Sequence, residues 1–200
     1  QSRKTPQGLA GRAIDAALYG PDHPLSFPAG GLPGTVEEIT LEDVKAYYAA
    51  RIPGHLKGIL VSTSLPQADT IAALQDFATI QTQEVFRENL AELPEMNERR
   101  LYLVNKEGAA QSSLRTGQPS IKYDALGDYF KAGLANFNLG GTFNSRINLN
   151  LREDKGYTYS ASTSFRGGQE LGSFGFSSEV NKEATAASLT EVINELESFA

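Results

Sequence analysis

The sequence predicts an α+β fold, with a largely antiparallel or mixed sheet of about five strands and helices packed on one face. Runs of residues that favour strands are joined by short turns, such as Gly167–Gly168, which suits antiparallel neighbours. Helical patterns interrupt these runs in pairs and do not follow every strand. The regular alternation of strand and helix that a doubly wound fold requires is therefore missing.

The first segment, residues 1–81, is predicted to contain two helices, a strand and a third helix. Apolar spacing predicts a helix over residues 7–19, and the run TLED from Thr40 matches the capping box that begins a second helix. The β-branched run GILVSTS at 58–64 predicts a strand, and helical spacing returns over 67–80. We expect this segment to share one sheet with the last segment, because the apolar faces of both need cover.

Residues 82–98 form a charged connector with few apolar side chains, which we interpret as a solvated linker and as the best domain boundary. A docking surface is the alternative interpretation. The last segment, 99–200, begins with strands predicted at 101–106 and 112–117 around a turn at Glu107–Gly108. A helix with the apolar stripe Leu126, Tyr129, Phe130, Leu134 and Phe137 should follow from Asp124, and the final helix should begin at Glu183.

The stretch 139–165, LGGTFNSRINLNLREDKGYTYSASTSF, combines a helix, its caps and a strand. Thr142 or Asn144 can accept hydrogen bonds from the first free amides of the helix, with Phe143, Ile147 and Leu151 as its apolar stripe. Gly156 suits the left-handed residue that ends it. In the following strand Tyr157 and Tyr159 share one face by alternation, before a hairpin to 171–180.

Composition excludes several classes of function. A net charge of −6 without a basic run argues against a nucleic-acid partner, and no apolar run approaches the roughly 20 residues needed for membrane insertion. The absence of cysteine excludes thiolate chemistry. His23 and His55 stand 32 positions apart without H-x-x-E-H or H-E-x-x-H around them, so a loop or packing role is favoured over a metal site.

The order of motifs resembles a known family. LGG-x-F-N-S-R-I followed by LREDKGYTYS looks like the second, non-catalytic domain of the pitrilysin and insulinase zinc metallopeptidases, in their bacterial processing-peptidase-like branch. LYGPDHP, ITLEDVKAYYAARI and QSSLRTGQPS agree, so the similarity spans nearly the whole chain. ILVSTSL departs from the Gly-Asp-like ending common in the family. The resemblance implies a LuxS-like, processing-peptidase-like fold.

The resemblance also implies roles for individual residues. The family's H-x-x-E-H motif binds zinc and activates water, and it is absent here, so the resemblance places zinc in the parent protein or in a partner and places no catalytic residue in this chain. It implies substrate contact by Arg152 and Tyr159, with Tyr157 as a secondary contact. The structural alternative is that Arg152 caps carbonyls at its own helix end and Tyr159 only packs on the helices. Arg146 is predicted separately to be a structural ion-pair partner.

Three functional hypotheses follow. In the first, the chain is the wall of a two-halved peptidase chamber that encloses a peptide substrate opposite a catalytic half or homologous subunit carrying H-x-x-E-H. In the second, it is a proteolytically inactive scaffold, like a core subunit. In the third, it belongs to a catalytic chain whose zinc motif lies just upstream, since the resemblance implies a piece that starts late in one family domain and ends partway through the next. The compartment stays unknown, with the periplasm favoured by the family alone.

Overall fold

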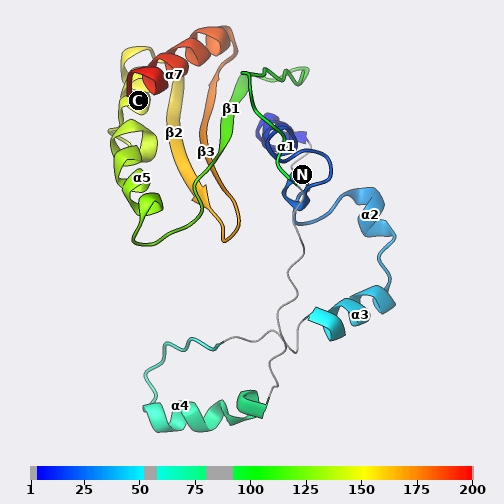
Figure 1. Ribbon diagram of the computed structural model, residues 1–200. Coiled ribbons are helices and arrows are strands. Elements are labelled where there is room, and N and C mark those ends of the chain that lie inside the picture. Colours follow the sequence, from blue (N-terminus) through cyan, green and yellow to red (C-terminus); the bar gives the residue numbers. More distant parts are fainter. Residues whose placement is uncertain (1–3, 52–57, 80–91, 200) are drawn as a thin grey trace. The chain divides into compact units, whose positions relative to one another are not determined.

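The structure, a computed structural model, describes residues 4–51, 58–79 and 92–199 (Figure 1). The chain divides into two compact units, one made of Gln1–Pro28 with Ala91–Ala200 and the other of Ala29–Leu90. Residues 82–91 of the predicted connector, like His55, lie outside the described residues. The predicted segment boundaries at 81 and 99 stay a prediction.

The unit Ala29–Leu90 contains short helices: α2 Pro33–Glu37, α3 Leu41–Arg51, α4 Gln67–Ala73 and the 3-10 helix η3 Gln75–Thr79. The predicted capping box begins α3: the amide of Thr40 donates to Asp43 Oδ2 at 2.9 Å, and the amide of Asp43 donates to Thr40 Oγ1 at 3.2 Å. Helix α4 ends at Ala73, earlier than the predicted residue 80. Local capping chemistry thus sets the start of α3.

The larger unit holds the sheet and most helices. Its elements are α1 Pro6–Tyr19, η2 Pro24–Ser26, β1 Gln111–Ser120, α5 Asp128–Asn136, η4 Phe137–Gly141, α6 Arg146–Asn148, η5 Leu149–Asp154, β2 Thr158–Gly167, β3 Gly172–Asn181, η6 Lys182–Ala184 and α7 Thr185–Phe199. The predicted first helix, hairpin and last helix are all present, within two residues at most of their predicted starts.

The sheet has three strands in the order β1-β3-β2, and both pairs are antiparallel. The prediction of about five strands is wrong, because 58–64 and 101–106 form no strand in the described chain. The expectation that 58–64 joins the sheet of β2 and β3 is wrong for the same reason. Apolar, β-branched residues favour strands only where a partner strand completes the hydrogen-bond ladder, and Leu60 and Leu103 are instead exposed.

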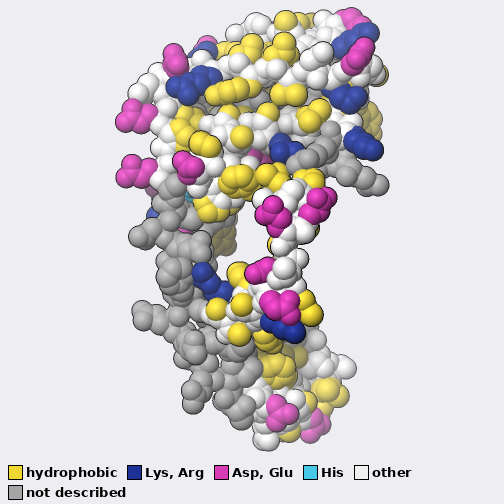
Figure 2. All heavy atoms as spheres, turned by 90° about the vertical axis from the view of Figure 1, so that its right-hand side faces the viewer, with side chains coloured by type: hydrophobic (Ala, Val, Ile, Leu, Met, Phe, Trp, Pro, Cys, Tyr) yellow, Lys and Arg dark blue, Asp and Glu magenta, His cyan; other side chains and the backbone are white. Residues whose placement is uncertain are grey.

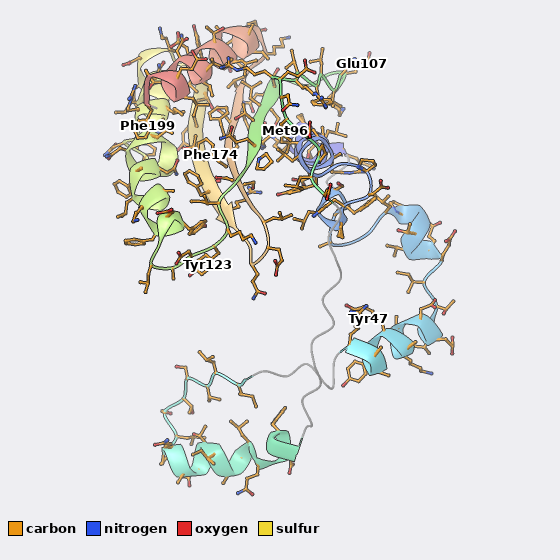
Figure 3. The ribbon with its side chains drawn as sticks, viewed as in Figure 1. Tyr47, Met96, Glu107, Tyr123, Phe174 and Phe199 are labelled. Carbon is orange, nitrogen blue, oxygen red and sulfur yellow. The ribbon has the colours of Figure 1, made fainter. Side chains whose placement is uncertain are left out.

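The core lies between one face of the sheet and the helices α5, α6 and α7 (Figure 1). Alternate residues of each strand point into it, so Ala161 and Phe176 meet Ile147, Leu151 and Val192. Phe174 and Phe199 pack at its margin (Figure 3). Helices were expected on one face, which holds for these three.

Helix α1 instead lies against the other face, where Leu18 and Ile14 come close to Gly117 of β1. A Cβ at residue 117 would meet Leu18 Cδ1 at 3.0 Å, so glycine allows the close approach.

Helix α5 differs from its prediction in two ways. It begins at Asp128 and not at Asp124. Three residues of its predicted apolar stripe are exposed, namely Phe130, Leu134 and Phe137, the last of which follows the helix. The core contacts of this helical region come instead from the buried Asn136 and Leu139.

Candidate functional site

The stretch between η4 and β2 winds in an unusual way. Helix α6 begins after Ser145, not after Thr142 or Asn144, and it continues into the π-helical turn η5, where the amide of Lys155 donates to the carbonyl of Asn150, five residues earlier. Gly156 then has φ of +65°, as predicted for the residue that ends the helix. Insertions of π-helix are frequent at functional sites, and Arg152 lies within this one.

The Arg152 guanidinium lies over two aromatic rings. Its central carbon is 4.2 Å from the ring centroid of Phe143 and 5.1 Å from that of Tyr159. The Arg152 side chain is 25% exposed, whereas Phe143 is 59% and Tyr159 80% exposed. These distances are typical of cation–π interactions, which gain strength when the cation is partly desolvated. We call Phe143, Arg152 and Tyr159 the aromatic–arginine cluster.

The charge of Arg152 is incompletely neutralised by the residues around it. Its Nε lies 3.4 Å from Glu153 Oε1, a weak ion-pair distance. Its Nη1 is buried and has no hydrogen-bond partner among the described residues. Because arginine carries five N–H donors in a planar fork and cannot give up its proton, its 25% exposed side chain has donor capacity beyond the contact with Glu153.

Tyr157 and Tyr159, which alternation placed on one face, have different surroundings. Tyr157 packs against the core, and its backbone is fixed by hydrogen bonds to Leu151 and Asn181, both 2.9 Å long. Tyr159 is largely exposed beside Arg152. The reason is an irregularity in β2: the register with β3 shifts between Thr158 and Ala161, which breaks the alternation. Arg152 therefore lies beside Tyr159, whereas Tyr157 packs against the core and not beside Arg152.

Two further residues belong to this neighbourhood and were missed as such. The sequence pattern places Phe143 on the apolar stripe of the helix, yet in the structure it precedes α6 and stacks on Arg152. The buried Asn148 donates to the carbonyl of Phe143 at 2.6 Å and accepts from the amide of Ala161 at 2.9 Å, so it ties the Phe143 loop to β2. The available signal was an asparagine on the otherwise apolar side of a helix, a polar group that must find partners when buried.

Arg146 makes different contacts. It pairs with Glu195 of α7 at 2.9 Å and donates to Ser198 Oγ at 2.8 Å. Its guanidinium also lies 5.6 Å from the Phe199 ring. Arg146 therefore forms an ion pair, as predicted from the sequence.

No group of three or more His, Asp or Glu residues that could hold a metal occurs in the described part of the chain. His23 is buried, accepts from the amide of Leu25 through Nδ1 and stacks on Tyr19 with 5.3 Å between ring centroids. It therefore packs and caps a 3-10 turn. Among the helices of residues 4–51, 58–79 and 92–199, none has the length and apolar character to cross a membrane.

Comparison with known proteins places the chain in a family. A model described as the peptidase M16 inactive domain matches residues 38–200. The chain therefore belongs to this family, and the resemblance to the non-catalytic domain of the pitrilysin and insulinase peptidases is confirmed. No curated protein matches the chain.

Solved structures agree on the fold. A peptidase M16 inactive domain from Pseudomonas fluorescens is 24% identical with a TM-score of 0.77, covering 99% of this chain and 47% of that one. A protease from Helicobacter pylori is 18% identical with a TM-score of 0.80, covering 98% and 48%. A conserved protein from Enterococcus faecalis V583 is 19% identical with a TM-score of 0.64, covering 96% and 44%. The chain thus spans slightly less than half of each of these structures.

Proposed function

We propose that this domain forms part of the wall around a bound peptide in a zinc-dependent peptidase, and that Arg152 and Tyr159 contact the peptide backbone. The zinc and the H-x-x-E-H motif would come from another part of the protein or from a partner subunit. The observation that carries the proposal is the meeting of Arg152 and Tyr159 at the surface, with 5.1 Å between guanidinium carbon and ring centroid. Two different elements, η5 and β2, supply them.

The chemistry of the pair suits a peptide. Guanidinium donors bind carbonyl oxygens, and a phenol hydroxyl can donate to an oxygen that gains negative charge during hydrolysis. Because Tyr159 is largely exposed and Arg152 partly so, a ligand can approach both from solvent. The rings of Phe143 and Tyr159 limit the rotamers of the guanidinium, which reduces the entropy lost on binding.

The test is peptide turnover by the intact protein together with the half or subunit that carries H-x-x-E-H. Arg152→Ala should lower kcat/KM by about tenfold or more, since hydrogen bonds to charged groups contribute about 1.5–3 kcal/mol. Tyr159→Phe removes one hydroxyl and should lower it less. Arg99→Ala and Tyr102→Phe, at exposed positions of the same unit, are matched controls. Turnover within about twofold of wild type in both test variants would exclude the proposed contacts.

A structural role for the pair is the second candidate, in line with a proteolytically inactive scaffold. It is favoured by the partial burial of the Arg152 side chain and by its stacking on Phe143. Under this alternative, Arg152→Ala lowers the free energy of unfolding while peptide turnover and peptide binding stay unchanged. Measuring both quantities on the same variant separates the two functions.

A further inference from the structure

Strand β2 contains a β-bulge directly before the regular part of the hairpin. Thr158 pairs with Val180 and Ala161 pairs with Ser178, so three steps along β2 match two steps along β3. Tyr159 and Ser160 together therefore occupy the space opposite Glu179. A bulge of this kind leaves backbone groups without their ladder partners and changes the direction of a side chain.

Two hydroxyl groups replace the lost ladder bonds. The amide of Ser160 donates to Thr158 Oγ1 at 3.2 Å, and the carbonyl of Ser160 accepts from Ser178 Oγ at 2.8 Å. Thr158 Oγ1 in turn donates to the carbonyl of Glu179 at 2.6 Å. Each hydroxyl has one hydrogen, and this assignment uses each hydrogen once. Both backbone groups of Ser160 are thus satisfied by side chains.

We infer that Thr158 and Ser178 are positioning residues, a hydroxyl clamp that fixes the bulge and thereby holds Tyr159 beside Arg152. Any effect of the clamp on a peptide rests on the proposed function of Tyr159. The position of the bulge itself does not.

The backbone on each side of the bulge is held by hydrogen bonds that do not involve the clamp. On one side of the bulge, the backbone of Tyr157 is bonded to Leu151 and Asn181. On the other side, the amide of Ala161 is bonded to Asn148. Between these fixed points the extra residue must be placed by local contacts, and the contacts to Ser160 come from Thr158 and Ser178. A buried serine within an apolar core is costly unless its hydroxyl is used, and that of Ser178 is used here.

The same two strands supply a matched control. Ser177 lies next to Ser178, and its Oγ is 3.4 Å from Ser162 Oγ in the regular part of the ladder. Ser177→Ala removes the same atom as Ser178→Ala without touching the bulge. Thr158→Val removes the clamp hydroxyl at constant shape, and Thr158→Ser keeps it.

The experiment is a set of crystal structures of the intact protein with these substitutions. In Thr158→Val and Ser178→Ala we expect the register at 158–161 to shift, or the 5.1 Å separation of Arg152 and Tyr159 to be lost. Ser177→Ala and Thr158→Ser should retain both. An unchanged bulge and an unchanged separation in both clamp variants would overturn the inference.

Amide hydrogen exchange provides the measurement for a variant that does not crystallise. The Ser160 amide should exchange at least about tenfold faster in both clamp variants and at the wild-type rate in Ser177→Ala, since its acceptor is lost or displaced only in the former. An unchanged Ser160 rate in both clamp variants contradicts the clamp.

Peptide turnover then separates this inference from the proposed function. If Tyr159 binds peptide, Thr158→Val should lower turnover by about the same factor as Tyr159→Phe, and Thr158→Ser should restore it. A bulge that moves while Tyr159→Phe leaves turnover unchanged supports the clamp and contradicts the substrate role. A bulge that does not move contradicts the clamp, whatever the turnover.

Discussion

The two units of this chain use similar sequence patterns with different results. Between Gln111 and Phe199, alternating and helical apolar patterns close a core in which Ile147, Val180 and Val192 have no exposed surface. In the described residues 29–51 and 58–77, no side chain is buried. Figure 2 shows hydrophobic side chains at the surface of the molecule, and Tyr47 of α3, labelled in Figure 3, is one of the exposed aromatic residues.

The comparison distinguishes two causes of secondary structure: local hydrogen bonds at a helix end and the packing of side chains in a core. Helix α3 forms where a capping box satisfies its first amides, with no buried face within the described residues. The sheet and its helices form where side chains distant in sequence fill one core. Capping and propensity are therefore sufficient to place a helix boundary, whereas burial decides which apolar residues carry stability.

The largest expected effect comes from matched isoleucines. Ile147→Ala empties a fully buried site and should lower the free energy of unfolding by about 2–5 kcal/mol. Ile71→Ala changes an isoleucine that is 57% exposed and should cost less than about 1 kcal/mol. Denaturant titration of both variants measures the difference. Equal losses would mean that the contrast in burial between the units has no energetic counterpart.

A smaller effect is expected from the buried asparagine that ties the Phe143 loop to β2. Asn148→Ala leaves the amide of Ala161 and the carbonyl of Phe143 without these partners, which should cost about 1–3 kcal/mol. Asn97→Ala, at an exposed position where the side-chain amide donates to Glu95, is the control and should change stability by less than about 0.5 kcal/mol. Thermal unfolding monitored by near-UV circular dichroism compares them. An Asn148→Ala variant with the thermal stability of the wild type would contradict the bridging role of Asn148.

The capping box should matter locally. Thr40→Ala removes the acceptor for the Asp43 amide and should destabilise α3 by about 1 kcal/mol.

The same capping box should make α3 sensitive to pH. Hydrogen bonds from Thr40 lower the pKa of the Asp43 carboxyl. A lowered pKa contributes stability above the unfolded value near 3.8 that is lost as pH falls through the folded value, so α3 should fray in acid. Amide exchange along α3 checks both effects, and protection that is independent of the substitution and of pH would refute them.

The smallest effect is expected at Asp15 of α1. Burial raises the pKa of its carboxyl, and the Arg166 charge partly opposes this shift. Because the folded chain then holds its proton more tightly than the unfolded chain, stability falls as pH rises above about 3.8. Asp15→Asn should therefore raise the unfolding midpoint slightly at pH 7 and have little effect at pH 3. A lower midpoint at pH 7 would show that the attraction to Arg166 outweighs burial.

Much of the fold could be predicted because the relevant signals are local. The capping box at Thr40, the left-handed glycine at 156 and the hairpin turn at 167–168 each depend on a few neighbouring residues. The failures at 58–64 and 101–106 have one cause. A β-strand forms only when a neighbouring strand completes its hydrogen bonds, and the sequence of a short apolar segment does not show whether such a neighbour is present.

The candidate site was predictable only in part. Arg152 and Tyr159 were singled out through a motif, and their proximity is observed in the structure. Phe143 was missed because apolar spacing cannot tell a helical stripe from a residue that precedes the helix. The separation of Tyr157 from Tyr159 was missed because a bulge adds a residue without any change in composition.

Tyr159 follows Arg152 by seven positions, and two one-residue expansions lie within or next to this interval, one on each side of Gly156. The π-helical turn η5 adds a residue to a helical turn, and the bulge adds a residue to β2. Deleting one residue from a helix rotates everything beyond it by about 100°, and deleting one from a strand exchanges its faces. The pairing of these two side chains is therefore sensitive to chain length as well as to residue identity, and a relative could keep both residues yet separate them by losing a single position.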